Sequence, residues 1–249
     1  MKKLIKIEKL SKQYPGSEKP ALSNLDFEIS EGELVAVVGP SGSGKSTLLR
    51  CINRLIEPST GNIFFKDENI NLIKGIKLRK YRSQIGFIFQ NYNLQNRLSV
   101  LENVLTGLLG QRSAISTTFG IWSEKDIKKA KKILKNLGLE NYIEKRADTL
   151  SGGEQQRVSI ARARIQNPKI ILADEPVASL DPPTAKKVLD DLKRISKEEK
   201  IAILVNLHDV DMALKYADRI LGLRLGEKVW DQKTSKTTKK SFEKIYMEK

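Results

Sequence analysis

Apolar residues in this chain form two patterns: short continuous runs and repeats at helical spacing. The runs at 34–38, 170–173 and 201–205 are apolar throughout, which predicts buried parallel strands. Residues 3–10 alternate between apolar and polar positions, which predicts an edge strand. Further strands are predicted at 21–29, 62–66 and 85–89, together with a hairpin of 220–225 and 229–230 around Gly226.

Helical spacing governs much of the remaining chain. Between 91 and 149 the pattern predicts helices and no strand, with one helix over 96–109 and another that begins at Ser123 and ends at Gly138. Helices are also predicted at 184–199 and 211–218. A helix directly after the first buried strand has its apolar stripe at Leu48, Leu49, Ile52, Leu55 and Ile56. These elements predict an α/β core with a helical segment inserted into it.

The segment Gly39-Pro40-Ser41-Gly42-Ser43-Gly44-Lys45-Ser46 lies between that strand and that helix and fits the phosphate-binding P-loop pattern. Its glycines let the backbone curl tightly, so that successive N–H groups point at an anion. Lys45 adds positive charge for the β- and γ-phosphates, and the Ser46 hydroxyl can ligate a nucleotide-bound Mg²⁺. Because the helix dipole also favours anions at this position, the pattern indicates a nucleotide site rather than an accidental turn.

Two carboxylates, Asp174 and Glu175, directly follow the strand 170–173. Open α/β sheets carry their chemistry at the carboxyl ends of their strands. Adjacent positions point to different sides, so one carboxylate can reach a metal through water and the other can face an attacking water. The alternative is an acidic surface turn, which is disfavoured because the same chain has a P-loop.

Three single residues are weaker candidates. His208 is the only histidine and follows the strand 201–205, where it could contact phosphate or be structural. Tyr14 could stack on a nucleotide base or pack in a turn. Gln90 closes the strand predicted at 85–89.

A second anion site is predicted at Ser151-Gly152-Gly153-Glu154, a turn that opens a helix running to about Gln166. Free backbone N–H groups at this helix start would face the anion. Any helix capped by serine could have the same pattern, so the residues alone leave this site open.

Composition limits the class of protein. The net charge of +15 would attract nucleic acid, anionic lipid or nucleotide, but no aromatic residues interleave with the lysines, which favours an ordinary solvated surface. Cys51 is the only cysteine, lies among apolar residues and is expected to pack in the core. No run approaches the roughly 18 apolar residues of a membrane span, and the first residues lack a signal-peptide core, so a cytoplasmic protein is expected.

Two segments are polar. Residues 113–120 are uncharged and rich in Ser and Thr, which predicts a loop. The Lys-rich tail from Asp231 is either a frayed end or a segment that docks a partner.

Nearly the whole chain resembles the ATP-binding subunits of ABC transporters. Tyr14 matches the adenine-stacking aromatic of that family, Gly39 to Ser46 its Walker A motif, and Gln90 its Q-loop. The resemblance implies a P-loop NTPase (RecA-like) core, an antiparallel β subdomain and an inserted α-helical subdomain. Residues 1–249 would then form one domain, with 1–90 and 160–249 in the ATPase core and 91–159 in the helical signature subdomain.

Four further segments carry the same resemblance. Leu150 to Glu154 matches the ABC signature, in which many relatives have Gln at the position of Glu154. Ile170 to Glu175 matches Walker B with its catalytic glutamate. The D-loop is matched by Ser179-Leu180-Asp181 and the H-loop by His208.

The resemblance also implies ATP and Mg²⁺ as cofactors and assigns roles to residues. Catalysis would fall to Glu175, helped by His208, Lys45 and Gln90. Metal binding would fall to Ser46, Gln90 and, through water, Asp174. ATP would be held by Tyr14, Gly39, Pro40, Ser41, Gly42, Ser43, Gly44, Lys45, Ser46 and Thr47. Two cassettes pair head to tail in this family, so the partner's ATP would be contacted by Ser151, Gly152, Gly153, Glu154 and Asp181.

Residues 96–105, 173–181 and 205–211 are similar to the ATPase of phosphonate importers. This likeness implies a peripheral subunit on the cytoplasmic face of the cell (inner) membrane that couples ATP hydrolysis to phosphonate, phosphite or phosphate-like uptake. Its partners would be a second copy of the chain, integral membrane permease subunits and a periplasmic or surface solute-binding protein, with no specific nucleic acid.

Two alternatives remain at this point. One is an import ATPase for another solute, such as an amino acid. The other is a soluble ABC-type ATPase that acts on nucleic acid or ribosomes. The single P-loop and the absence of sustained heptads between Gln90 and Ser151 disfavour the second alternative.

Overall fold

Two β-sheets of different kinds organise the computed structural model, which describes residues 2–112, 122–238 and 242–246. The six-stranded sheet has the order β10-β9-β3-β8-β7-β6, in which the five strands from β9 to β6 are parallel and β10 is antiparallel. Its strands are β3 (Leu34–Val38), β6 (Ile85–Ile88), β7 (Ile170–Ala173), β8 (Ala202–Asn206), β9 (Arg219–Arg224) and β10 (Glu227–Lys233). The three buried runs and the hairpin predicted from the sequence are therefore confirmed.

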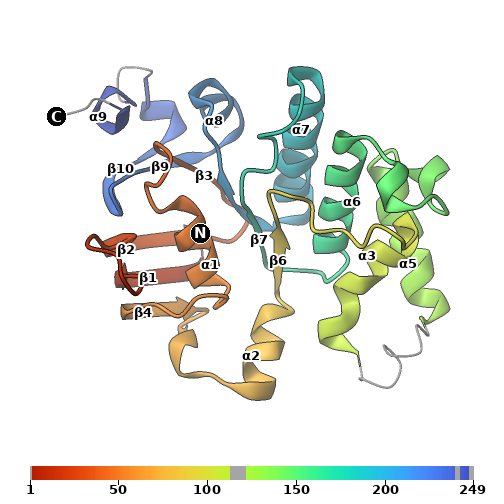
Figure 1. Cartoon of the computed structure of the whole chain (residues 1–249), viewed down its shortest axis with the longest axis horizontal. Helices are drawn as coiled ribbons and strands as arrows, with labels where there is room; N and C mark the ends of the chain where they lie inside the picture. Colours follow the sequence, from red (N-terminus) through yellow and green to blue (C-terminus); the bar gives the residue numbers. More distant parts are fainter. Residues whose placement is uncertain (1, 113–121, 239–241, 247–249) are drawn as a thin grey trace.

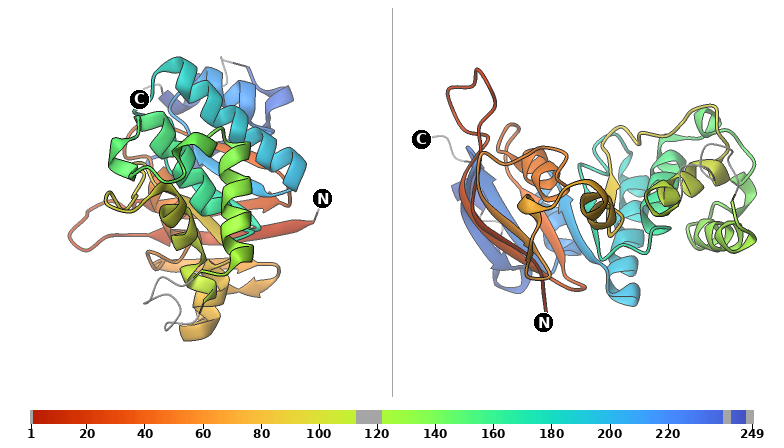
Figure 2. Two further views of the ribbon diagram at one scale, coloured as in Figure 1. Left: turned by 90° about the vertical axis from the view of Figure 1, so that its right-hand side faces the viewer. Right: turned by 90° about the horizontal axis from the view of Figure 1, so that it is seen from below.

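Both faces of the six-stranded sheet are buried, because successive side chains of each strand point to opposite faces. Leu34, Ala36 and Val38 of β3 belong to a core shared with helices, whereas Val35 and Val37 belong to a core shared with α1 and the second sheet. The helices of the first core are α3 (Val100–Leu105), α5 (Glu124–Asn136), α6 (Gly152–Arg164), α7 (Pro182–Glu199) and α8 (Val210–Tyr216). Figure 2 shows α3, α5 and α6 together at one end of the molecule and the second sheet at the other.

The second sheet is antiparallel, has the order β2-β1-β4-β5, and covers α1 (Lys45–Ile52). Its strands are β1 (Lys3–Lys12), β2 (Leu22–Ser30), β4 (Thr60–Phe65) and β5 (Glu68–Asn69). The prediction that residues 3–10 form an edge strand was wrong, since β1 pairs with both β2 and β4. Alternation reports that one face of a strand is buried, which is equally true of an inner strand whose other face meets solvent.

Several helix boundaries differ from their predictions. α1 ends at Ile52, so Leu55 lies outside it and is exposed. The helix predicted over 96–109 is only α3 followed by 3-10 turns at Thr106–Gln111. The helix α2 (Gly75–Arg82) was not predicted, because Tyr81 is its only buried residue and gives no apolar stripe. The N-cap at Ser123 is confirmed by its hydrogen bond from the Asp126 N–H, whereas the loop predicted at 113–120 lies outside the described residues.

The C-terminal tail packs against the hairpin over part of its length. β10 continues to Lys233, beyond the point where the sequence pattern becomes polar. Phe242 is buried, and its ring lies edge-on to Trp230 at 5.3 Å. The short helix α9 (Glu243–Tyr246) follows it. The tail is therefore packed rather than frayed at Phe242, and its docking to a partner stays a prediction.

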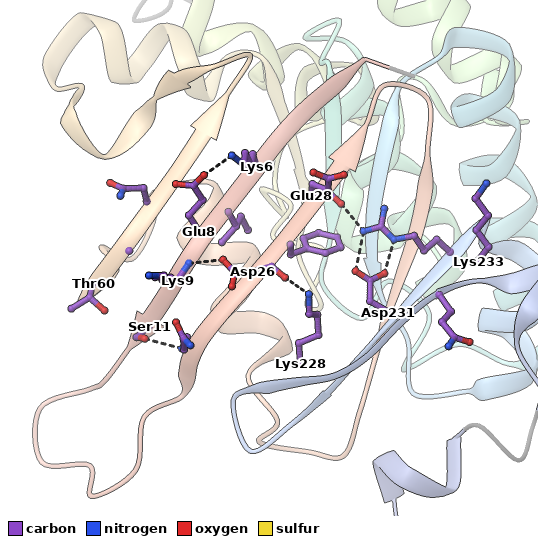
Figure 3. Close-up of a pocket in the computed structure, with 17 residues that line it drawn as sticks. Lys6, Glu8, Lys9, Ser11, Asp26, Glu28, Thr60, Lys228, Asp231 and Lys233 are labelled. Atoms are coloured by element: carbon purple, nitrogen blue, oxygen red, sulfur yellow. Dashed lines mark hydrogen bonds and ion pairs between the residues drawn. The ribbon is translucent and has the colours of Figure 1, made fainter.

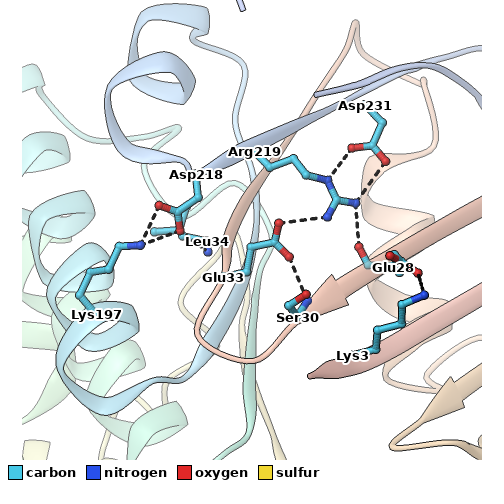
Figure 4. A network of polar contacts seen from close by, with 9 residues as sticks. All are labelled: Lys3, Glu28, Ser30, Glu33, Leu34, Lys197, Asp218, Arg219 and Asp231. Atoms are coloured by element: carbon cyan, nitrogen blue, oxygen red, sulfur yellow. Dashed lines mark hydrogen bonds and ion pairs between the residues drawn. The ribbon is translucent and has the colours of Figure 1, made fainter. Parts of the chain in front are cut away.

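Arg219, at the start of β9, joins the two sheets (Figure 4). Its guanidinium donates to Asp231 at 2.6 Å, to Glu33 at 3.0 Å and to the backbone oxygen of Glu28 at 2.8 Å. It also lies 5.1 Å from the centre of the Phe27 ring. All these groups are largely removed from water, which makes each one costly to leave unpaired.

Replacing Arg219 should destabilise the fold. We expect Arg219→Ala to lower the free energy of unfolding by about 2–4 kcal/mol, because Asp231 and Glu33 would stay largely buried without their partner. Lys3→Ala is the matched control, since it removes only an exposed ion pair to Glu28 and should cost about 0.5 kcal/mol. Urea denaturation followed by circular dichroism measures both variants, and equal losses would contradict the role given to Arg219.

Candidate nucleotide-binding site

Four parallel strands bring the predicted site residues to one edge of the sheet. β3, β8, β7 and β6 are neighbours in that order, so their carboxyl ends lie side by side. The P-loop follows β3, Asn206 ends β8 with His208 just beyond it, Asp174 and Glu175 follow β7, and Gln90 follows β6. The topology therefore gathers residues that are up to 169 positions apart, as the interval from Gly39 to His208 shows.

The P-loop has a backbone that only glycine fits at two positions. Gly44, the N-cap of α1, has a φ of 101°, and a Cβ there would lie 2.3 Å from the Ala21 oxygen. A Cβ on Gly39 would lie 2.1 Å from the Leu223 oxygen. Lys45 is 4% exposed and its ammonium donates to the Gly39 and Pro40 oxygens at 2.8 and 3.0 Å. Burial lowers the pKa of Lys45, while Glu175 and Asp174 act to raise it.

Asp174 is held by two donors from different elements. Its Oδ1 accepts hydrogen bonds from the Ser46 hydroxyl and from the Asn206 amide, each at 2.7 Å. Asp174 is 3% exposed and Asn206 is fully buried. Sequence reasoning missed Asn206, although an amide at the end of a strand beside two carboxylates was a usable signal. The Asn206 Oδ1 has no hydrogen-bond partner in the described part of the chain.

The donor set at this point fits Mg²⁺. A hydroxyl, a carboxylate and the Gln90 amide oxygen are the hard oxygen ligands that Mg²⁺ prefers, alongside phosphate and water. No cluster of three His, Cys, Asp or Glu side chains among the described residues would bind a metal alone, so the ion would arrive with a nucleotide. Bound there, it would neutralise phosphate charge.

Glu175 points away from Asp174. Its Oε1 lies 2.6 Å from His208 Nε2, and its Oε2 accepts a hydrogen bond from the Gln90 amide at 3.1 Å. Glu175 has a φ of 50°, a left-handed conformation that is uncommon for this residue type. Residues that follow β6, β7 and β8 therefore meet at the Glu175 carboxylate. Asp174 and Glu175 point to different sides and have different hydrogen-bond partners, as the sequence predicted.

A cavity of about 300 Å³ lies over the P-loop. Glu175 is one of its lining residues, and the buried Ser43 hydroxyl, also in the lining, has no hydrogen-bond partner among the residues that the structure describes. Tyr14 is 37% exposed, with its hydroxyl 3.3 Å from the Thr47 hydroxyl. The cavity is lined by Ala21, Ser41, Gly42, Ser43, Gly44, Lys45, Ser46, Thr47 and Glu175. These contacts bring together nearly all the residues predicted to bind ATP or catalyse its hydrolysis.

The signature turn lies elsewhere in the chain, at the start of α6 (Figure 1). Ser151 caps the helix and accepts from the Glu154 N–H, while the Glu154 carboxylate accepts from the Ser151 N–H at 2.8 Å. Burial opposes ionisation of Glu154, but hydrogen bonds from Tyr142 and Ser151 hold its pKa below the usual value. Asp181 caps α7 in the same way through the Thr184 N–H. Neither turn lines the cavity over the P-loop.

α6 also holds the chain just after Gln90. Arg162 donates to the backbone oxygens of Tyr92 and Asn93, which both have a positive φ. A Cβ on Gly152, at the other end of the helix, would lie 2.9 Å from the Tyr92 hydroxyl. The Q-loop of this chain is therefore in contact with both ends of the helix that begins at the signature turn.

A larger cavity, about 1210 Å³, lies away from this site (Figure 3). It lies between the outer face of β1, β2 and β4 and the hairpin of β9 and β10. Several of its charged groups are already engaged: Lys6 pairs with Glu8 at 2.5 Å, and the Lys228 ammonium donates to the backbone oxygen of Asp26 at 2.6 Å. None of the predicted site residues lines it.

The fold and the strand-end site together define a P-loop ATPase of the cassette type. Residues 22–178 match the ABC transporter family, and the chain belongs to that family. A dimeric ATP-binding cassette solved in a post-hydrolysis state, bound to ADP and Pi, is 37% identical with a TM-score of 0.82, over 93% of this chain and 99% of that one. The α/β cassette fold predicted from the sequence is thereby confirmed.

Within the ABC transporter family, the chain is similar to curated proteins of phosphonate import. Phosphonates import ATP-binding protein PhnC 2 of Oceanobacillus iheyensis is 50% identical over 243 residues, which are 98% of this chain and 95% of the relative. Phosphonates import ATP-binding protein PhnC of Treponema denticola is 47% identical over 228 residues, 92% of this chain and 89% of the relative. The predicted resemblance to the ATPase of phosphonate importers is confirmed.

Asn206 should act as a positioning residue for Asp174. We expect Asn206→Leu to leave ATP affinity in EDTA unchanged but to reduce the gain in affinity on adding Mg²⁺ by about tenfold, because Asp174 loses one donor. Fluorescent-nucleotide titration with and without Mg²⁺ measures this gain. An equal loss of affinity in both conditions would show that Asn206 matters only for packing.

Proposed function

We propose that this chain is the ATP-hydrolysing subunit of an import complex that takes up phosphonate or a phosphate-like solute. The relatives near 50% identity support the solute class, because they are phosphonates import ATP-binding proteins and align with nearly the whole chain. The hydrolytic step rests on one observation: Glu175 at the end of β7, 2.6 Å from His208 and facing the cavity over the P-loop.

Each predicted residue takes a place in that hydrolysis. Lys45 exchanges the loop oxygens of Gly39 and Pro40 for the β- and γ-phosphates. Ser46, Gln90 and Asp174 are the residues that would hold Mg²⁺. Glu175 accepts a proton from, or orients, the water that attacks the γ-phosphate, and His208 donates to that phosphate.

Before Glu175 can act on water, its carboxylate must be released from its present hydrogen bonds. Both oxygens of its carboxylate are engaged, by His208 and by Gln90. With Gln90 among the residues that would hold Mg²⁺ and His208 donating to phosphate, both oxygens of Glu175 would be available for water. ATP binding thus prepares the base by taking away its two partners, which is a population shift driven by differential contacts.

A second copy of the chain completes the site in this proposal. The N–H groups of Gly152 and Gly153 are at the first turn of α6, where a helix leaves them without internal partners. Ser151, Gly152, Gly153, Glu154 and Asp181 would contact the ATP bound to the opposite P-loop. Dimeric cassettes with a TM-score of 0.82 to this chain support this arrangement.

The permease would dock in a groove of about 530 Å³ between α2, the turns at Thr106–Gln111 and α6. Phe87 and Phe89, with ring centres 4.5 Å apart, line it together with Arg162, which holds the Q-loop. A membrane subunit there would touch both the Q-loop and the signature helix. The complex would lie on the cytoplasmic face of the cell membrane with a solute-binding protein on the other side. Within the described residues, no helix has the length and apolarity to cross a bilayer itself.

Glu175→Gln should separate binding from turnover. We expect the variant to bind ATP as the wild type does and to hydrolyse it about 10²–10⁴-fold more slowly, because the general base is gone. It should also accumulate as an ATP-bound dimer, which size-exclusion chromatography with ATP detects. Hydrolysis at the wild-type rate would remove Glu175 from its role.

An uptake assay in whole cells tests the proposed solute class. In cells lacking the chromosomal copy, we expect the wild-type chain to restore uptake of radiolabelled methylphosphonate, whereas Lys45→Ala and Glu175→Gln should not. Glutamine uptake by the same cells is the control and should not change. Normal methylphosphonate uptake in the deleted strain, with loss of amino-acid uptake, would contradict the proposed solute and leave the ATPase assignment standing.

A further inference from the structure

The helix α2 and the residues before it expose apolar and basic side chains together. Ile76 and Leu72 are 86% and 78% exposed, the highest values for large apolar side chains in the described part of the chain. They are four residues apart and lie among the exposed Lys74, Lys77 and Lys80. These five residues are called the α2 patch below.

The α2 patch is positively charged and uncompensated. Between Glu68 and Glu102 the sequence has six basic residues and no acidic one. Within the ranges that the structure describes, the ammonium groups of Lys74, Lys77 and Lys80 have no hydrogen bond or ion pair. A surface with this charge attracts a polyanion or an anionic surface.

The patch is held rigidly from below. The Tyr81 hydroxyl donates to the Ile52 oxygen at 2.5 Å, and its ring lies edge-on to Phe65 at 5.2 Å. Arg79 donates to the oxygens of Leu109 and Gly110 at 2.9 and 3.0 Å. Ile76 is therefore presented by an anchored helix, and Leu72 by the 3-10 turn Ile70–Leu72 just before it.

We propose that the α2 patch binds the anionic surface of the membrane in which the permease is embedded. Leu72 and Ile76 enter the headgroup region, and the three lysines face lipid phosphates. The proposal rests on the proposed function, because α2 borders the groove assigned to the permease and so faces the membrane with it.

Lipid fits this patch better than a protein partner does. Protein interfaces rely on aromatic side chains and arginine and are depleted in lysine. Here the aromatic Tyr81 is buried, and Arg79 and Arg82 are bound to backbone oxygens. What remains exposed is lysine and two aliphatic side chains, the combination found where proteins lie on anionic bilayers.

Co-sedimentation of the purified full chain with vesicles tests the proposal. We expect it to bind vesicles of phosphatidylcholine and phosphatidylglycerol in equal parts, and to bind pure phosphatidylcholine much more weakly. The pair Lys77→Gln and Lys80→Gln should lower the partition coefficient by about fivefold per lysine. Leu72→Ser with Ile76→Ser keeps the charge and should lower it by about tenfold.

The matched control changes charge elsewhere. Lys186 on α7 and Lys236 after β10 are exposed, and these elements lie at the end of the molecule opposite α2 (Figure 1). Replacing both by Gln should change vesicle binding by no more than about twofold, because charges beyond a Debye length are screened. An equal loss in this control would reduce the binding to net charge and overturn the proposal.

Two other results would also overturn it. One is wild-type binding by the Leu72→Ser, Ile76→Ser variant, since the aliphatic side chains would then play no part. The other is normal vesicle binding by every patch variant together with lost uptake, which would place the patch against the permease. ATP hydrolysis by the free subunit should be unchanged in all patch variants, so failure here leaves the ATPase assignment intact.

Discussion

A single buried carboxylate ties the catalytic edge of this protein together. Asp174 is almost fully removed from water, which is costly unless its oxygens are hydrogen-bonded. Its donors come from the first turn of α1 and from β8, and its own backbone N–H donates to Ile88 at the end of β6. Three strands and the P-loop helix are therefore fixed relative to one another at one residue. The distances on which phosphate chemistry depends follow from that constraint.

Most of this arrangement could be predicted from the sequence, because the chemistry there depends on local patterns. Two apolar runs are directly followed by functional residues, one by Gly39 to Ser46 and the other by Asp174 and Glu175. Each such pattern predicts a strand, the place where it ends and the side chains that lie there. The edge assignment of β1 failed because alternation does not report hydrogen-bonding neighbours. Asn206 was missed for a related reason: its role depends on a carboxylate 32 residues away, which only the sheet order brings near.

The helix α2 shows the limit of pattern reading most clearly. It has one buried residue, so hydrophobic spacing could not reveal it. Its position is set by side chains that reach outward, as Arg79 does to the Leu109 oxygen and Arg82 to the Asn53 oxygen. Tertiary hydrogen bonds here replace the amphipathic stripe that usually fixes a surface helix. The tail at Phe242 is similar, since an aromatic contact with Trp230, and not a hydrophobic stripe, holds this residue in the core.

The grip of Arg162 on the chain after Gln90 has a further consequence. In a head-to-tail pair, each α6 would meet one nucleotide through its signature turn while its other end holds the Q-loop that serves the second nucleotide. A rigid helix that joins the two places transmits displacement between them. Occupancy of one ATP site would then alter the affinity of the other, so the pair would titrate as two coupled sites rather than as two independent ones.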